Sequence, residues 1–227
     1  MNPRLGRRAN IQVIFWDFGN VCATFDFERF VSAFSKHVGN TPEEVRAVLF
    51  VGDTQVVTYA PLFRALECGE VTPCQFFSKL TDALGCSAQI DYATFAHMWA
   101  DIFLKENIEL CELMERIPLE HYLLSNTNEI VRSRYVARSS IVRTHIRAPC
   151  KQVLSHSVGA MKPDPRIYTE ALRRVGIPAS QCLFVDDVNE NINAWRLLGG
   201  HGIVYNAKHD WIDDLEAKLR HTGVLIN

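Results

Sequence analysis

Five residues of this sequence have types and positions that could carry out chemistry. Asp17 follows the apolar run "QVIFW", Ser125 ends "HYLLS", and Asp186 ends "CLFVD" directly before a second acid, Asp187. Lys162 lies in the loop sequence "GAMKPDP". Gathered carboxylates need a cation and favour Mg²⁺, while a lysine beside hydroxyl and amide donors favours a phosphoryl group. These residue types predict Mg²⁺-assisted phosphoryl transfer, with an aspartate available as the nucleophile.

The elements that must position these residues are short buried strands. Four apolar runs, at residues 12–16, 121–125, 182–186 and 202–205, have strand character. Amphipathic helical patterns follow the last three, which indicates a parallel sheet built from βα units. Ligands bind such sheets at the carboxyl ends of the strands, where the polar residues lie. We therefore expect an α/β fold with a doubly wound, mostly parallel, Rossmann-like sheet and one site at its edge.

The segment between the first two predicted strands is too long for a single crossover helix. It contains helix signals, including capping boxes that begin at Thr41 and Thr72. We expect residues 22–105 to form an all-helical subdomain inserted after the first strand. Residues 1–21 and 106–227 would then form the α/β core.

Composition and charge exclude several classes of protein. The chain has 227 residues, a formal net charge of −2 and seven cysteines without a metal-site or disulfide pattern, which suits a reducing compartment. The apolar run after the basic N-terminus is short and broken by Asp17, so neither a signal peptide nor a membrane span is expected. Residues 130–163 hold seven Lys or Arg and no acid, which indicates a solvated basic face or anion steering. We expect a cytoplasmic protein without nucleic-acid or membrane partners, whose oligomeric state the sequence leaves open.

Four segments resemble, in order, the motifs of the haloacid dehalogenase (HAD) superfamily of phosphohydrolases. They are "VIFWDFGNV", "LLSNTN", "AMKPDP" and "LFVDDVNEN". The long helical segment directly after the first motif is similar to the family branch with a helical cap. The resemblance spans roughly residues 11–205, and it rests on the four motifs as a set.

The resemblance implies a role for each residue at the predicted metal. Asp17 would attack phosphorus and form an aspartyl-phosphate. Mg²⁺ would be bound by Asp17, by the backbone carbonyl of Gly19 and by Asp186. Asp187 would lie close to the metal or act through water.

The resemblance also assigns the residues around the phosphoryl group. Ser125 and Lys162 would hold its oxygens, and Asn126 would contact the phosphate or the substrate. Asn191 would support the acidic loop from behind. The partner is then a small phosphorylated metabolite.

One residue departs from the usual pattern. Most phosphatases of the family carry a second Asp, the general acid, where this chain has Gly19. The "DFGN" form resembles a DxGN branch that includes sugar-1-phosphate phosphatases. Without that acid, leaving groups that depart as stable anions are favoured, and a sugar 1-phosphate qualifies in part. If another group supplies the proton, Asp26 is the first candidate.

Two other functions compete with the phosphatase hypothesis. A haloacid dehalogenase also lacks an acid at the position of Gly19, but it tends to lose the paired acids of the fourth motif. A non-catalytic binding protein could keep the fold and Mg²⁺ after losing its general acid. The retained Asp17, Lys162 and Asp186 argue against such decay.

Overall fold

The computed structural model describes residues 10–52 and 58–227, and its centre is a five-stranded parallel sheet. In sheet order the strands are β7 (Gln152–Leu154), β6 (Glu120–Ser125), β1 (Val13–Trp16), β8 (Cys182–Asp186) and β9 (His201–Val204). The four predicted strands are confirmed to within a few residues. The edge strand β7, which is only three residues long, was not predicted.

Helices cover both faces of the sheet because side chains alternate along each buried strand. In β1, Val13 and Phe15 pack into one apolar cluster, and Ile14 and Trp16 into the other. The first face is covered by α10 (Pro165–Val175) and α11 (Asn189–Leu197). The second is covered by α6 (Ile108–Glu115), α7 (Glu129–Arg134), α8 (Ser140–His145) and α12 (Ile212–Thr222). This is the predicted doubly wound α/β fold.

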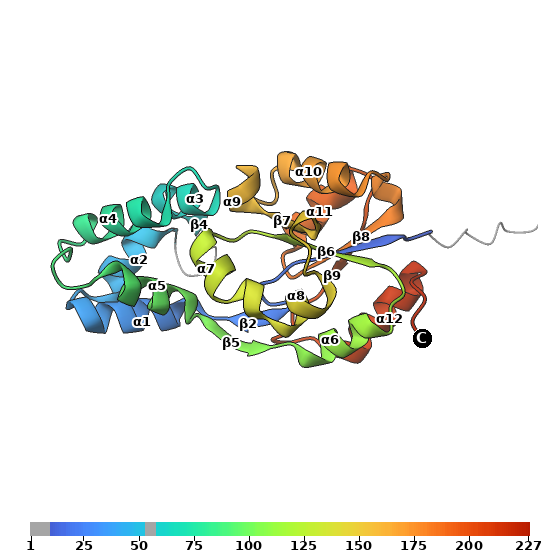
Figure 1. Ribbon diagram of the computed structural model, residues 1–227, viewed down its shortest axis with the longest axis horizontal. Coiled ribbons are helices and arrows are strands. Elements are labelled where there is room, and N and C mark those ends of the chain that lie inside the picture. Colours follow the sequence, from blue (N-terminus) through green and yellow to red (C-terminus); the bar gives the residue numbers. More distant parts are fainter. Residues whose placement is uncertain (1–9, 53–57) are drawn as a thin grey trace, which may run out of the picture.

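A helical insert, defined here as the elements from β2 to β5, follows the first strand. Strands β2 (Ala23–Phe25) and β5 (Phe103–Glu106) pair antiparallel where the chain leaves and rejoins the sheet-containing core. Between them lie α1 (Phe27–Val38), α2 (Pro42–Leu49), α3 (Pro61–Glu67), α4 (Pro73–Ala83) and α5 (Tyr92–Ala100). Figure 1 shows these helices in one lobe and the parallel sheet in the other.

The insert contains more than the helices that the sequence predicts. Besides the β2–β5 pair, a two-stranded sheet joins β3 (Phe50–Val51) to β4 (Thr58–Tyr59). Both expected capping boxes are present, at Thr41 and Thr72, and helix α3 is additional. The C-terminal end of α3 lies against the short helix α9 (Ser155–Val158) of the core, as Figure 1 shows. The insert therefore contacts the core beyond the connecting strands.

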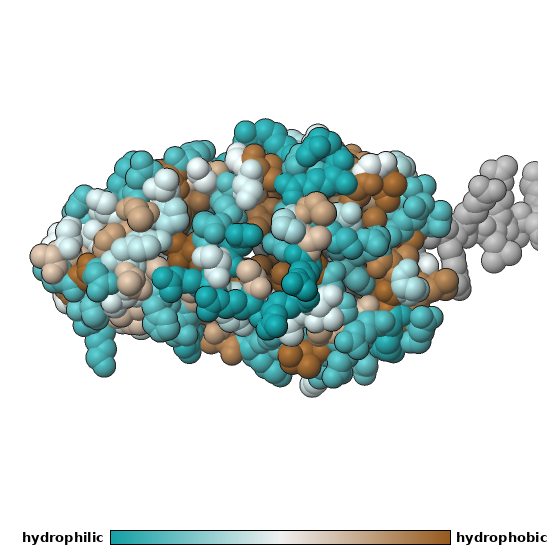
Figure 2. Space-filling model, in the orientation of Figure 1, coloured by the Kyte–Doolittle hydropathy of each residue, from teal (hydrophilic) through white to brown (hydrophobic). Residues whose placement is uncertain are grey.

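The molecular surface carries mixed polarity. Figure 2 shows hydrophilic side chains over most of the visible face, with smaller apolar patches between them. Among the helices of the described residues, none is both long and apolar enough to cross a bilayer.

Candidate active site

The carboxyl ends of three adjacent strands bring the predicted acids together. Strand β1 pairs in parallel with both β6 and β8, so their ends reach the same edge of the sheet. Asp17 comes directly after β1, and its backbone N–H donates to the carbonyl of Val185 at 2.9 Å. Asp17, Asp186 and Asp187 each offer a carboxylate oxygen within 4.8 Å of the others. The sequence prediction of one acidic cluster is thus met by the geometry.

Lys162 extends into this cluster and is buried by it. Its Nζ lies 2.7 Å from Asp17 Oδ1 and 2.7 Å from Asp186 Oδ2, and only 1% of its side chain is exposed. It also donates to the carbonyl of Leu124 at 3.0 Å. Burial would lower the pKa of Lys162, but the two carboxylates raise it above its usual value. The lysine is therefore an ammonium ion that bridges two acids.

One lysine does not neutralise three carboxylates, and the pKa values of two of these acids are raised. Burial raises the pKa of Asp17 to about 7; Lys162 opposes this rise, and Asp186 and Asp187 add to it. Burial also raises the pKa of Asp187, while a hydrogen bond from Asn20 lowers it. A cluster of hard oxygen donors with surplus negative charge fits a divalent cation such as Mg²⁺.

Two asparagines hold the acids in place. Asn191 Nδ2 donates to both carboxylate oxygens of Asp186, at 3.0 and 3.1 Å, which is the supporting position expected for it. Asn20 Nδ2 donates to Asp187 Oδ2 at 2.9 Å. The backbone of Asn20 has φ = 54°, a left-handed conformation that Asn tolerates better than most residues. Asn20 is the last residue of the "DFGN" stretch, and its role at Asp187 was not predicted.

Asn126 holds the lysine loop through both ends of its amide. Its Oδ1 accepts from the backbone N–H of Lys162 at 2.7 Å, and its Nδ2 donates to the Lys162 carbonyl at 3.0 Å. The side chain thus fixes the lysine, while the expected contact of Asn126 with phosphate or substrate stays a prediction. Ser125 is buried at the end of β6, where its hydroxyl has only a long 3.5 Å contact to the Asn126 carbonyl.

A small cavity of about 50 Å³ lies between the core and the insert. The core lines it mainly with Phe18, Gly19, Ser125, Asn126, Thr127, Asn128 and Val131, and the insert with Phe25, Phe27, Tyr59, Glu67, Ile102 and Phe103. The predicted phosphate end therefore faces a mostly aromatic wall that contains one carboxyl group.

The structure gives a physical reason for Gly19. A Cβ atom built at Gly19 would lie 2.7 Å from Cε1 of Phe25, much closer than carbon atoms pack. A second acid at this position would require the Phe25 ring to move. Asp26 instead caps α1, where its side chain accepts from the backbone N–H of Glu28, and it does not line the cavity.

Glu67 is the candidate residue that sequence reasoning missed. It ends α3, is only 4% exposed and accepts a 2.6 Å hydrogen bond from Asn128 Nδ2 of the core. A signal existed, because Phe63, Leu66 and Glu67 have the spacing of one helix face and all three are buried. An acid on the apolar face of a helix is unusual enough to be singled out.

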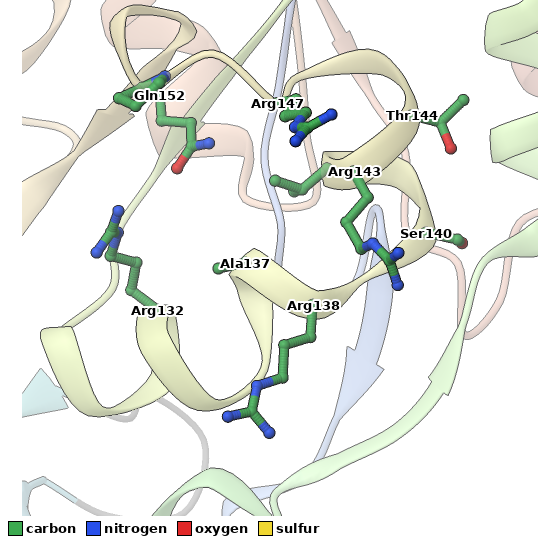
Figure 3. A pocket seen from close by; sticks show the side chains of 10 residues that line it. Arg132, Ala137, Arg138, Ser140, Arg143, Thr144, Arg147 and Gln152 are labelled. Atoms are coloured by element: carbon green, nitrogen blue, oxygen red, sulfur yellow. The ribbon is translucent and has the colours of Figure 1, made fainter.

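The basic segment mostly lies elsewhere. Arg132, Arg138, Arg143 and Arg147 line a separate hollow of about 690 Å³ beside α7 and α8 (Figure 3), which shares no lining residue with the cavity between core and insert. Of the seven cations expected on a basic face, Lys162 belongs to the acidic site. Lys162, which was predicted for the acidic site, lies apart from these arginines, and anion steering by the arginines stays a prediction.

The chain resembles two curated phosphatases along most of its length, although no family model matches it. It is 26% identical to D-ribitol-5-phosphate phosphatase of Bacteroides thetaiotaomicron over 215 residues, which cover 92% of this chain and 98% of that protein. It is 23% identical to a phosphatase of Mycobacterium tuberculosis over 231 residues, or 96% and 98% of the two chains.

A solved structure has the same fold. It is a HAD family enzyme from Bacteroides thetaiotaomicron in complex with magnesium and inorganic phosphate, with a TM-score of 0.70 and 24% identity over 88% of this chain and 97% of that one. The parallel sheet and the acidic site at its carboxyl edge define a Rossmann-like α/β fold of the HAD type. The chain shares this fold with the HAD family enzyme, and it is similar in sequence to the two phosphatases over nearly their whole lengths.

Proposed function

We propose that this protein is a Mg²⁺-dependent phosphatase of a small phosphorylated metabolite. The observation that carries the proposal is the buried contact of Lys162 with both Asp17 and Asp186 at the carboxyl edge of the sheet. Both phosphatases matched along the chain support the same reaction class. Asp17, the Gly19 carbonyl, Asp186 and Asp187 would hold the cation, which supplies charge stabilisation to the phosphoryl group.

The chain's own residues would then perform a two-step transfer. A carboxylate oxygen of Asp17 attacks phosphorus, the bond from phosphorus to the leaving oxygen breaks, and that oxygen takes up a proton. Water then hydrolyses the aspartyl-phosphate, releasing inorganic phosphate and restoring the Asp17 carboxylate. Lys162 and Ser125 would bind the transferring phosphoryl oxygens throughout.

The leaving group is proposed to come from a sugar or a related polyol. Because Gly19 supplies no acid, esters with good leaving groups should react faster, and a sugar 1-phosphate fits this expectation in part. The relative from Bacteroides thetaiotaomicron is named for D-ribitol 5-phosphate, a primary ester of a polyol. Both candidates share a hydroxyl-rich carbon skeleton. The paired acids Asp186 and Asp187 argue against dehalogenation, which needs no metal.

The test measures phosphate release from a panel of esters with Mg²⁺, with EDTA, and in Asp186→Asn. We expect turnover that EDTA abolishes and that Asp186→Asn lowers by at least about 10²-fold, because the cation stabilises charge that develops on phosphorus. Asp164→Asn is the matched control, since Asp164 caps α10 and pairs with the exposed side chain of Arg166. Full activity in EDTA, or release of halide from 2-chloropropionate instead of phosphate, would refute the proposal.

A further inference from the structure

The carboxyl group of Glu67 is buried between the insert and the core without a cation beside it. Within residues 10–52 and 58–227, no lysine, arginine or histidine forms an ion pair with Glu67, and its one hydrogen bond comes from Asn128. Burying an acid without a charged partner is costly, and titratable groups in such environments cluster at functional sites. Its position on the cavity wall indicates what that use could be.

The amide of Asn128 is held in the orientation that faces Glu67. Asn128 is the N-cap of α7, and its Oδ1 accepts from the backbone N–H groups of Ile130 at 3.1 Å and Val131 at 3.2 Å. The Nδ2 group must therefore point away from the helix, and it meets Glu67 Oε1 at 2.6 Å. The core thus presents amide donors to the cavity at a fixed place, and the insert presents a carboxyl group opposite them.

A third polar group lines the same cavity. The hydroxyl oxygen of Thr127 is buried and has no hydrogen-bond partner among the described residues. Buried hydroxyls are nearly always hydrogen-bonded in native proteins. An orphan hydroxyl on a residue that lines the same cavity as a carboxyl and an amide indicates a place where a ligand supplies the missing partner.

These groups continue the site away from the phosphoryl end. The cavity is lined by Gly19 and Ser125 as well as by Glu67 and Asn128. A substrate whose phosphate lies at Asp17 would therefore extend its leaving group toward Glu67.

We propose that Glu67 and Asn128, with Thr127, form a subsite that binds hydroxyl groups of the leaving group, and that the substrate is the phosphate ester of a polyol or sugar. The proposal rests on the phosphatase function proposed above. Burial raises the pKa of Glu67 to about 7, so near neutral pH its carboxyl can both donate and accept, as a hydroxyl partner requires. The surrounding aromatic rings suit the carbon skeleton between the hydroxyls.

The insert must move for such a substrate to enter. A cavity of about 50 Å³ is far smaller than the pockets of roughly 300–1,000 Å³ that hold small molecules. At the end of α3, Gly69 (φ = 67°) lies so close to the core that an added Cβ would be 2.2 Å from the carbonyl oxygen of His156. In this proposal the Glu67–Asn128 hydrogen bond closes the cavity, and substrate hydroxyls replace that bond.

The experiment compares esters that differ only in hydroxyl groups. D-ribitol 5-phosphate is paired with n-pentyl phosphate, and glucose 1-phosphate with cyclohexyl phosphate. For the better pair, the wild-type protein is expected to prefer the hydroxylated ester by about 10²-fold or more in kcat/KM. Glu67→Met should reduce that preference by about 10- to 100-fold, because a hydrogen bond to the ligand is lost.

Controls separate binding of hydroxyls from a structural role. Glu67→Gln keeps the size and hydrogen-bonding capacity of the side chain and should retain most of the preference for hydroxylated esters. Asn128→Ser keeps the helix cap but should lose this preference. Turnover of p-nitrophenyl phosphate, whose leaving group carries no free hydroxyl, is measured in each variant as the reference rate, and all rates should change less than about threefold in the exposed control Glu70→Met.

Three results would overturn the subsite. They are a wild-type protein without preference for hydroxylated esters, a preference that is unchanged in Glu67→Met, and a preference that Asn128→Ser retains in full. Each of these leaves the phosphatase function intact, because p-nitrophenyl phosphate still reports it. Absence of Mg²⁺-dependent release from every ester, p-nitrophenyl phosphate included, would overturn the proposed function and the subsite with it.

Discussion

The core and the helical insert contribute to the site in different ways. The core supplies Asp17, Ser125 and Asp186 from the ends of adjacent parallel strands, where the backbone ladder fixes their positions. The insert supplies Glu67 from the end of a helix whose other buried residues pack an aromatic interior. The site residues of the core are therefore positioned by the strands that carry them. Glu67 is positioned by the packing of the insert against the core.

The interior of the insert shows why this lobe supplies few residues to the site. Trp99 is surrounded by aromatic rings, with Phe30 at 4.7 Å, Phe76 at 5.0 Å and Phe63 at 5.1 Å between centroids. These ring contacts stabilise the insert, but the rings do not face the acidic site of the core. We therefore expect substitutions in the core motifs to affect chemistry, and those on the facing side of the insert to affect the choice of substrate.

The largest effect that this comparison predicts is at Asp17. Asp17→Asn removes the nucleophile while keeping the size of the side chain, so kcat should fall by at least about 10⁴-fold for every ester. The measurement is phosphate release under saturating Mg²⁺, with circular dichroism to check the fold. A matched Asp91→Asn change, at an exposed N-cap of the insert, should leave kcat within about twofold.

A phosphoryl adduct would identify the nucleophile directly. Mass spectrometry of protein quenched during turnover should locate the adduct on Asp17. An adduct on Ser125, or residual activity of more than a few per cent in Asp17→Asn, would contradict the assignment and remove the contrast between the two lobes.

The same contrast explains what the sequence could reveal. Asp17, Ser125 and Asp186 end apolar runs, and a parallel sheet has only one edge to which those ends can go, so their meeting could be predicted from the sequence. Lys162 needed the family resemblance, because a loop lysine carries no positional signal of its own. Strand β7 was missed because three residues give too short a pattern to separate from a loop.

Other features depend on contacts that no local pattern encodes. The reason for Gly19 lies in Phe25, which belongs to β2, the strand that pairs with β5 where the chain enters the insert. Glu67 faces Asn128, which lies 61 residues further along the chain and in the other lobe. The side-chain amide of Asn126 is hydrogen-bonded to the backbone of Lys162, which lies 36 residues further along the chain. Such pairings follow from how the lobes and loops pack, which a single sequence does not specify.

The second prediction concerns stability and tests whether Glu67 is buried as an acid. Burial raises its pKa from 4.5 to about 7, so between these values the native state binds more protons than the unfolded state. The free energy of unfolding should therefore decrease as the pH rises from about 4.5 to about 7, by about 3 kcal/mol from this group. Glu67→Gln should lack that decrease.

Urea unfolding of the wild-type protein and of Glu67→Gln, each at pH 5 and pH 8 in EDTA, measures this change in the free energy of unfolding. The difference between the two proteins isolates Glu67, because Asp17, whose pKa burial also raises, titrates in both. Parallel pH profiles would show that the carboxyl is solvated, and the insert would then contribute only apolar contacts to the cavity.

The smallest effect lies where the two lobes touch, at Gly19 and Phe25. Gly19→Ala places a Cβ 2.7 Å from the Phe25 ring, so we expect a loss of about 1–3 kcal/mol in the free energy of unfolding. In Phe25→Leu, which shortens the opposing side chain, the same change should cost less, with a coupling energy of about 1 kcal/mol. A double-mutant cycle by urea unfolding gives this value. If Gly19→Ala costs the same in both backgrounds, Phe25 is not what excludes a side chain at position 19.

If the coupling is found, the insert itself prevents this core from carrying a second acid. Gly19→Asp in the Phe25→Leu background should then raise turnover of n-pentyl phosphate relative to p-nitrophenyl phosphate, because only the alkyl ester needs a proton on its leaving oxygen.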